Sequence, residues 1–359
     1  MRDVTALESV DVTLELKLNA IIEDYFDRNA AKAEKISPYY GQLWQEMNRL
    51  VRSGGKRLRP KMTLLAYRAF GGTDVKAILP IAAAQELLHL SMLIHDDIID
   101  RDYVRYGVDN IAGSYDKLYE SLVSDKTDRL HYAHSAALLA GDLLISGAYQ
   151  LTLESSVDPA KIIEIQKIFG RSLFEVAGGE LIDTESAFRE LGAIKAETVA
   201  LYKTASYTFI GPLAVGALLA GASVEDRTLL RLFAKNIGIA FQLRDDIIGI
   251  FGDEQQTGKT TIGDIREGKR TYLVEQFYER ATPDDIESFN RYFGDHSIVQ
   301  QDAQIVKDLL IKSGALQKTE EVINAYETKA RSALDGIAIN PELEAQLEDL
   351  IRIATRRQQ

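Results

Sequence analysis

The sequence predicts an all-α protein that forms a single domain over residues 1–359. Apolar residues recur at spacings of three and four, and no segment shows the sustained alternation of a half-buried strand. The seven prolines mostly stand where helices are expected to begin or turn. No low-complexity tract, composition break or solenoid-length repeat divides the chain. These observations predict roughly a dozen helices and no sheet.

The most apolar segments are expected to form buried helices in the middle of a bundle, with more amphipathic helices around them. These segments are residues 82–98, 136–151, 212–221 and 229–251. Ser223 followed by Asp226 resembles an acidic capping box and predicts a helix from about Val224 to Phe251. Thr282-Pro283 predicts the start of another helix in the same way.

Two polar stretches interrupt the helical pattern. Residues 107–129 are predicted to form a loop and a short amphipathic helix. Residues 253–271, rich in glycine and in basic side chains, directly follow the longest buried segment. Because long polar loops in compact proteins are often functional, the second stretch is a candidate part of a site.

Composition and charge exclude several classes of function. A formal net charge of -12 argues against nucleic acid as the main partner, and an anionic ligand would need local lysine, arginine or metal. The absence of cysteine excludes disulfides, thiolate metal sites and a cysteine nucleophile, and it fits a reducing cytoplasm. The charged N-terminus lacks the apolar stretch of a signal peptide. No run reaches the roughly 18–20 apolar residues of a membrane span.

The stretch "HLSMLIHDDIID", residues 89–100, ends an apolar helix with three aspartates. Asp96 and Asp100 are four residues apart and therefore lie on one helix face, with His89 two turns before Asp96 on that face. Clustered carboxylates repel one another and are costly to bury, so a cation is expected to hold them or water to surround them.

A second acidic pair, Asp245-Asp246, ends another apolar helix in "FQLRDDIIGIFGDE", with Gln242 one turn before Asp245. Each helix end offers oxygen ligands without cysteine or a histidine cluster. Oxygen-only sites favour Mg²⁺, which usually shares its coordination shell with substrate phosphates. The two motifs together therefore indicate a magnesium-dependent site for a phosphate-bearing substrate.

Each motif taken alone has a simpler interpretation. A single DDxxD is common by chance, "GGKRLRP" can be a solvated basic turn, and a lone histidine on an apolar helix is usually a core residue. "TGKT" at residues 257–260 lacks the glycine spacing and preceding strand of a P-loop. The functional interpretation depends on two carboxylate clusters and several basic segments occurring in one helical chain.

This combination resembles the trans-isoprenyl diphosphate synthases, or polyprenyl synthetases, and among them the short-chain geranylgeranyl and farnesyl diphosphate synthases. The segments that match in order are "GGKRLRP", "HLSMLIHDDIID", "LLAGDLL", "GGELID", "YKTASYTF", "FQLRDDIIGIFGDEQQTGK" and "DIREGKRT". The resemblance implies an all-helical bundle of the isoprenoid synthase type with a deep central cavity. It also implies a homodimer.

The resemblance implies a role for each matching residue, beginning with about three Mg²⁺ ions per site. The expected metal ligands are Asp96, Asp100 and Asp245, with Asp97, Gln242 and Asp246 in support. The residues expected to bind the allylic diphosphate are Arg105, Lys203, Lys259 and Lys269, with Thr204 near the leaving oxygen. The residues expected to bind isopentenyl diphosphate are Lys56, Arg59 and His89.

The implied reaction is a head-to-tail condensation. Ionisation of the allylic diphosphate is followed by attack of the isopentenyl double bond and loss of a proton. Three positions depart from the family pattern. Tyr106 replaces a second arginine that helps to bind isopentenyl diphosphate, Gly249 replaces a third aspartate, and Glu180 replaces a common glutamine.

Product length is expected to depend on residues one or two turns below Asp96 on the same helix. They are Leu88, Ser91 and Met92. In the family, an aromatic residue at the position of Ser91 stops growth at farnesyl, so a serine there favours geranylgeranyl diphosphate. A longer prenyl chain or farnesyl diphosphate is the alternative.

Two other functions remain open at the level of sequence. A non-catalytic subunit of a heteromeric synthase usually loses an acidic motif, and this chain keeps both; only Tyr106 favours that alternative. A class I terpene cyclase shares the fold and the metal chemistry but needs no second diphosphate site. The segment "GGKRLRP" together with His89 argues against a cyclase.

Overall fold

The computed structural model describes residues 12–190, 192–252 and 262–356. These residues form two compact units by their internal contacts. The first unit contains residues 12–64 and 72–166, and the second contains residues 65–71, 167–190, 192–252 and 262–356. The boundary falls within α3 (Leu58–Ala69) and α7 (Pro159–Ser186). The single-domain assignment stays a prediction.

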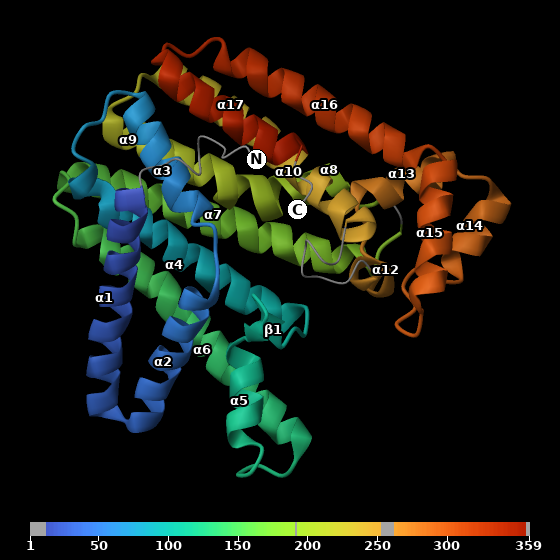
Figure 1. Cartoon of the computed structure of the whole chain (residues 1–359), viewed down its shortest axis with the longest axis horizontal. Helices are drawn as coiled ribbons and strands as arrows, with labels where there is room; N and C mark the ends of the chain where they lie inside the picture. Colours follow the sequence, from blue (N-terminus) through green and yellow to red (C-terminus); the bar gives the residue numbers. More distant parts are fainter. Residues whose placement is uncertain (1–11, 191, 253–261, 357–359) are drawn as a thin grey trace. The chain divides into compact units, whose positions relative to one another are not determined.

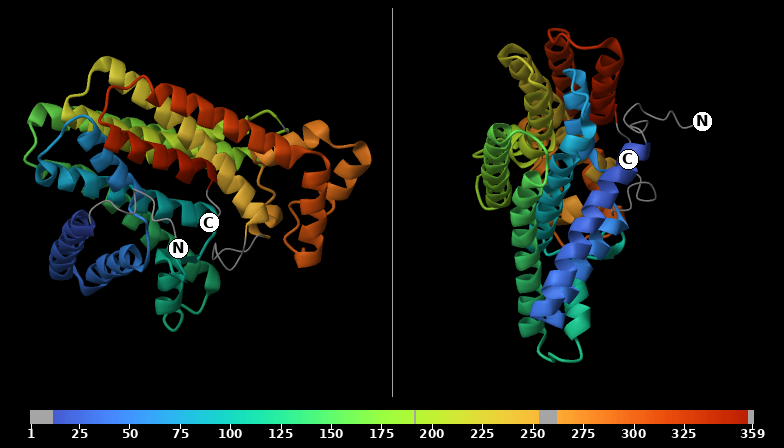
Figure 2. Two further views of the ribbon diagram at one scale, coloured as in Figure 1. Left: turned by 45° about the horizontal axis from the view of Figure 1, so that its top comes forward. Right: turned by 90° about the vertical axis from the view of Figure 1, so that its left-hand side faces the viewer.

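The first unit is built on two helix pairs (Figures 1 and 2). Its remaining elements are α1 (Val12–Ile36), α2 (Pro38–Ser53), α4 (Val75–Ile99), α5 (Ile111–Tyr119) and α6 (Lys126–Leu153). Helix α1 packs against α2, and α4 packs along α6. The sharp turn between α1 and α2 is made by Ser37, whose side chain caps the backbone N–H of Tyr39, and by Pro38 at the first helical position.

Helix α4 is the core helix of the first unit. Leu87, Leu90 and Ile94 are all 4% exposed or less. Helices α4 and α6 are long and apolar enough to cross a membrane by length and composition, with mean hydropathies of 1.6 and 1.3 in their most apolar windows. In α4, 72% of that window is buried within the protein. The core helix of a globular protein gives the same signal, so this is weak evidence for a span.

The prediction of no sheet is wrong at one place. Strands β1 (Val104–Arg105) and β2 (Val108–Asp109) pair as a short antiparallel hairpin. The two turn residues, Tyr106 and Gly107, have φ of 54° and 75°, the positive values that a type I′ turn requires. Helix α5 follows at once, so the predicted short helix within residues 107–129 is confirmed, although β2 and the first turn of α6 also fall in this stretch.

The second unit is built around α10 (Val224–Phe251), which, among the described elements, packs against five other helices and a π-helix. The predicted bounds of α10 and its cap are confirmed, since the Ser223 hydroxyl accepts the backbone N–H of Asp226 at 3.0 Å. The predicted start at Thr282 is also confirmed. The other elements are α8 (Ala196–Val199), the π-helix η1 (Ala200–Ile210), α9 (Gly211–Ala220), α12 (Gly263–Glu267), α13 (Tyr272–Arg280), α14 (Pro283–Asn290), α15 (Gln300–Lys312), α16 (Ala315–Leu334) and α17 (Pro341–Arg356).

Small residues let η1 approach its neighbours closely. A Cβ on Gly238 of α10 would lie 2.4 Å from the Ala205 side chain of η1. A Cβ on Gly179 of α7 would lie 2.2 Å from the backbone nitrogen of Lys203. Because π-helical segments are rare and concentrate at functional sites, the presence of η1 makes this part of the second unit a candidate functional site. The all-α fold class predicted from the sequence is confirmed.

Candidate active site

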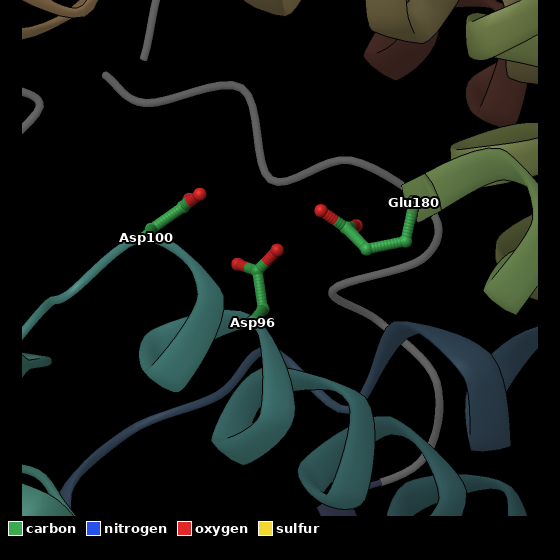
Figure 3. Close-up of side chains that lie close together, drawn as sticks. All are labelled: Asp96, Asp100 and Glu180. Carbon is green, nitrogen blue, oxygen red and sulfur yellow. The ribbon is translucent and has the colours of Figure 1, made fainter. Parts of the chain in front are cut away.

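The first acidic motif lies at the C-terminal end of α4. Asp96 is on the last full turn, and Asp100 caps the helix with its backbone N–H on the Asp96 carbonyl at 2.8 Å. Figure 3 shows both carboxylates pointing away from the helix end on the same side; it also labels Glu180, which belongs to α7 of the second unit. Both aspartates are partly exposed, as a metal site open to substrate requires.

Asp97 has different surroundings from its two neighbours. It is 2% exposed and accepts hydrogen bonds from Arg105, whose Nε lies 2.7 Å from Asp97 Oδ1. Arg105 also reaches Asp96 Oδ2 at 3.5 Å. Burial raises the pKa of Asp97, and the hydrogen bonds from Arg105 oppose that shift. Asp97 therefore holds Arg105 beside the motif.

The basic segment Gly54–Pro60 lies in the same unit and leads into α3. Lys56 is exposed, whereas Arg59 is 8% exposed. His89 is partly buried on α4, and burial followed by the charges of Arg59, Arg105 and Arg57 holds its pKa well below the ordinary value. The imidazole is therefore neutral, and it would bind an anion by a hydrogen bond instead of an ion pair.

Tyr106 occupies the hairpin turn where the family usually has an arginine. A Cβ added to Gly54 would lie 2.6 Å from its ring, so the ring rests on the glycine backbone of the basic segment. Burial raises the pKa of the phenol, which keeps it protonated and able to donate a hydrogen bond. One neutral donor thus stands where a second cation was expected.

In the second unit, η1 and α7 bring a lysine between two carboxylates. Lys203 Nζ lies 3.0 Å from Glu180 Oε1 and 2.6 Å from Asp183 Oδ2. The glutamate that replaces the common glutamine therefore forms an ion pair with a predicted diphosphate ligand. Sequence reasoning did not select Asp183, although it lies three residues after Glu180 and hence on the same helix face.

A hydrogen-bond chain links η1 to the second acidic motif. The Thr204 hydroxyl donates to the side-chain oxygen of Gln242, and the Gln242 amide donates to Asp246 Oδ1 at 2.8 Å. Burial, and then repulsion from Asp264, Asp245 and Asp183, raises the pKa of Asp246 to about 8, against the opposing hydrogen bond from Gln242. The sequence predicted Asp246 as a supporting acid but could not show this crowding of carboxylates.

The remaining predicted cations follow α10. Lys269 Nζ lies 3.2 Å from Glu267 and 3.5 Å from Asp264. Gly249 leaves room for Asp264, because a Cβ there would lie 1.9 Å from its carboxylate. Lys259 lies outside the described residues, as does "TGKT". In the second unit, the described part of the chain thus gathers Lys203, Lys269 and several carboxylates around α10 and α7.

Comparison with known proteins identifies the chain. Residues 41–310 match the sequence profile of the polyprenyl synthetases, which is most of the chain. The chain belongs to the polyprenyl synthetase family. It is 31% identical over 335 residues to a geranylgeranyl diphosphate synthase of Sulfolobus acidocaldarius, covering 91% of each chain. It is also 31% identical over 317 residues to a geranylfarnesyl diphosphate synthase of Aeropyrum pernix, covering 85% of this chain and 89% of that one.

A solved structure supports the same family assignment. The geranylgeranyl pyrophosphate synthase of Corynebacterium glutamicum, in complex with isoprenyl diphosphate and magnesium, superposes with a TM-score of 0.89 at 28% identity. The match covers 96% of this chain and 98% of the other. The family resemblance inferred from the sequence motifs is confirmed.

The oxygen donors of this polyprenyl synthetase fit magnesium. Asp96 and Asp100 present carboxylates from one helix face. Asp245 lies within α10 next to Asp246, whose pKa is raised first by burial and then by repulsion from neighbouring carboxylates. Mg²⁺ prefers such hard oxygen ligands. A cation near α10 would relieve the repulsion that the described residues leave there.

Stability is expected to depend on pH through Asp246. Because its pKa is about 8 in the fold and 3.8 in the free side chain, the unfolded chain binds fewer protons between these values. The melting temperature of the metal-free protein should therefore fall as pH rises from about 6 to about 8, and Asp246→Asn should flatten the slope. The exposed Asp308→Asn variant is the control. An equal slope in all three proteins would contradict the assignment.

The chain-length positions also have defined surroundings in the first unit. Ser91 is fully buried and its hydroxyl donates to the Leu88 carbonyl at 2.7 Å. Met92 is partly exposed and lies on the Asp96 face, four residues before it. Leu88 is 5% exposed. Met92 and, one turn before it, Leu88 follow the spacing of four that leads to Asp96, whereas Ser91 does not.

Proposed function

We propose that this polyprenyl synthetase condenses isopentenyl diphosphate with an allylic prenyl diphosphate and releases geranylgeranyl diphosphate. The observation that carries the proposal is that the first unit contains both a basic segment and an acidic helix end. Lys56, Arg59 and His89 supply donors for one diphosphate, and Asp96 with Asp100 supplies oxygens for metal bound to another. A terpene cyclase would need no such second anion site.

The residues that bind the allylic diphosphate are proposed to be Arg105, Lys203, Lys269 and Lys259. Three of them have described contacts, and each of these three is paired with carboxylates. Such cations are held at the site before substrate arrives and can exchange a carboxylate for a diphosphate oxygen. Mg²⁺, held by Asp96, Asp100 and Asp245, would neutralise the negative charge that develops on the departing diphosphate.

The remaining chemistry requires positioning and exclusion of water. The cations hold the allylic diphosphate while its carbon–oxygen bond breaks, and the isopentenyl double bond then attacks the allylic carbon. Thr204, held by Gln242, is placed by η1 beside Lys203. The apolar side chains of α4, such as Leu88, line the helix below the motif and exclude the water that would quench a carbocation. The proton lost at the end is proposed to leave with the diphosphate.

A geranylgeranyl product is supported by the serine at position 91 and by the relatives. Replacing Ser91 with Phe is expected to shorten the main product to farnesyl diphosphate, because a bulky ring below the acidic motif closes the space for the chain. Ser91→Ala should leave the product unchanged. Radiolabelled products separated by chain length give the measurement. An unchanged length in Ser91→Phe would place the stop elsewhere, with Met92 the next residue to test.

A longer product is the second candidate, because one relative is a geranylfarnesyl diphosphate synthase.

A homodimer is proposed as well. Helix α6 exposes more than half of Leu138 and Leu139, and α7 exposes more than half of Phe174 and Leu181. Apolar side chains exposed along helices in this way are typical of protein interfaces. Sedimentation of the wild-type chain and of a Leu139→Lys variant tests the dimer.

The proposed function is tested by incubating the purified chain with Mg²⁺, labelled isopentenyl diphosphate and, in turn, dimethylallyl, geranyl and farnesyl diphosphate. The expected main product is the twenty-carbon diphosphate. A dominant fifteen-carbon product would refute the length assignment. Turnover without isopentenyl diphosphate would indicate a cyclase, and no turnover by the chain alone would indicate a subunit of a heteromeric enzyme.

A further inference from the structure

The basic segment of the first unit has an unusual backbone. Gly55 has φ of 111° and Arg57 has φ of 51°. A positive φ is strained at a non-glycine residue, and it persists where the surroundings determine the conformation. Since Lys56 lies between these two residues, the same backbone sets where its side chain begins.

The contacts of the Arg57 side chain hold the backbone of the basic segment in this conformation. Its guanidinium donates to Asn19 Oδ1 at 3.2 Å, to the Gly54 carbonyl at 3.1 Å and to the Val51 carbonyl at 2.7 Å. It also forms an ion pair with Glu86 at 2.8 Å. These partners come from α1, the end of α2, the loop itself and α4. Four of the five guanidinium N–H donors are thereby used, so most of the hydrogen-bonding capacity of Arg57 goes into holding the loop.

Glu86 lies in the interior of the first unit. The side chains of Arg57 and Glu86 are 11% and 5% exposed, so their attraction is little screened by water. Gly55 makes room for the pair, because a Cβ there would lie 2.5 Å from Arg57 Nη1 and 3.4 Å from Glu86 Oε1. Gly55 therefore leaves room for the ion pair and also allows the positive φ of the backbone at this position.

The pair connects the two elements that carry the proposed isopentenyl diphosphate ligands. Lys56 and Arg59 flank Arg57 in the chain, and His89 follows Glu86 by three residues on the same face of α4. An ion pair between residues 57 and 86 therefore sets the distance between the loop cations and the histidine. Misplacing a binding group by about 1 Å can cost up to about 10²-fold in rate or affinity.

We propose that Arg57 and Glu86 are a positioning pair for isopentenyl diphosphate, acting through Lys56, Arg59 and His89 without contacting the substrate. The inference rests on the proposed function. Because the pair acts on one substrate's binding site, its loss should weaken ground-state binding of that substrate. Loss of the pair should therefore raise the KM for isopentenyl diphosphate, while kcat and the KM of the allylic substrate stay close to wild type.

The test compares Arg57→Gln, Arg57→Lys and Glu86→Gln with the wild-type enzyme. We expect the KM for isopentenyl diphosphate to rise about 30-fold in Arg57→Gln and about tenfold in Glu86→Gln, with Arg57→Lys between wild type and Arg57→Gln. The allylic KM and kcat should change less than about threefold. The matched control is Arg28→Gln, which removes an ion pair that joins α1 to Glu154 of the same unit but is exposed. It should leave all constants unchanged.

Three outcomes would overturn the inference. If Glu86→Gln lowered the KM for isopentenyl diphosphate, Arg57 would be a direct ligand freed from its partner. If both KM values rose equally, the pair would support the whole unit. If the melting temperature fell while both KM values stayed unchanged, the role of the pair would be stability alone.

Should the wild type fail to condense isopentenyl diphosphate, the proposed function fails. Calorimetry with inorganic diphosphate on the same variants then tests the pair separately. Unchanged affinity in Arg57→Gln would then overturn it.

Discussion

Replacing Asp96 with Asn is expected to lower kcat by about 10³-fold while leaving the fold intact. The carboxylate stands at the end of α4 next to Asp97 and Asp100, and its contact with Arg105 is long, at 3.5 Å. Removing one of three neighbouring negative charges relieves repulsion, so the melting temperature should stay equal or rise slightly. Steady-state kinetics at saturating Mg²⁺ and thermal unfolding together give the measurement.

A loss of activity without a loss of stability distinguishes a functional carboxylate from a structural one. Asp128→Asn, at an exposed position in the first turn of α6, removes an equal charge from the same unit and should keep full activity. If Asp96→Asn retained more than about a tenth of wild-type kcat, the assignment of this motif to metal binding would be wrong.

Replacing Gly179 with Ala is expected to have the second largest effect, because the new methyl group would meet backbone. A Cβ at Gly179 would lie 2.2 Å from the Lys203 nitrogen and 2.5 Å from the Tyr202 carbonyl carbon. Helix α7 and η1 would have to separate, which costs about 1–3 kcal/mol and moves the Lys203 side chain away from Glu180 and Asp183. We expect a lower melting temperature and an allylic KM raised about tenfold or more.

The neighbouring glycine is a natural control for this variant. No atom lies within 4 Å of a Cβ built on Gly178, which is exposed on the same helix. Gly178→Ala should therefore stabilise α7 by about 0.5–1 kcal/mol through helix propensity and leave both KM values unchanged. Equal behaviour of the two alanine variants would show that η1 tolerates displacement, against the close packing described above.

The parts of the fold that were predicted are those with strong local signals. Helix α10 was bounded correctly because Ser223 caps it and its apolar stripe is long. The hairpin escaped prediction because two-residue strands contain no alternation, and Tyr106-Gly107 is not one of the usual type I′ pairs. The π-helix η1 has the same apolar pattern as an α-helix, and the extra residue per turn leaves no mark in the sequence.

In the candidate site, too, arrangements within one helix were predicted, whereas contacts between residues distant in the sequence were not. A spacing of four placed Asp96 and Asp100 on one face, and the structure keeps them there. The ion pair of Arg57 with Glu86 joins residues 29 positions apart, and no periodicity predicts it. Asp97 was assigned to metal support, yet its buried contact with Arg105 depends on the hairpin that the sequence did not reveal.

We propose above that Asp96, Asp100 and Asp245 hold magnesium diphosphate for condensation with isopentenyl diphosphate. A crystal structure with Mg²⁺ and an unreactive allylic diphosphate analogue tests it most directly. We expect carboxylate oxygens of Asp96, Asp100 and Asp245 to lie about 2.1 Å from metal ions that also contact the diphosphate. Metal ions bound elsewhere, or a diphosphate held without any of these three carboxylates, would contradict it.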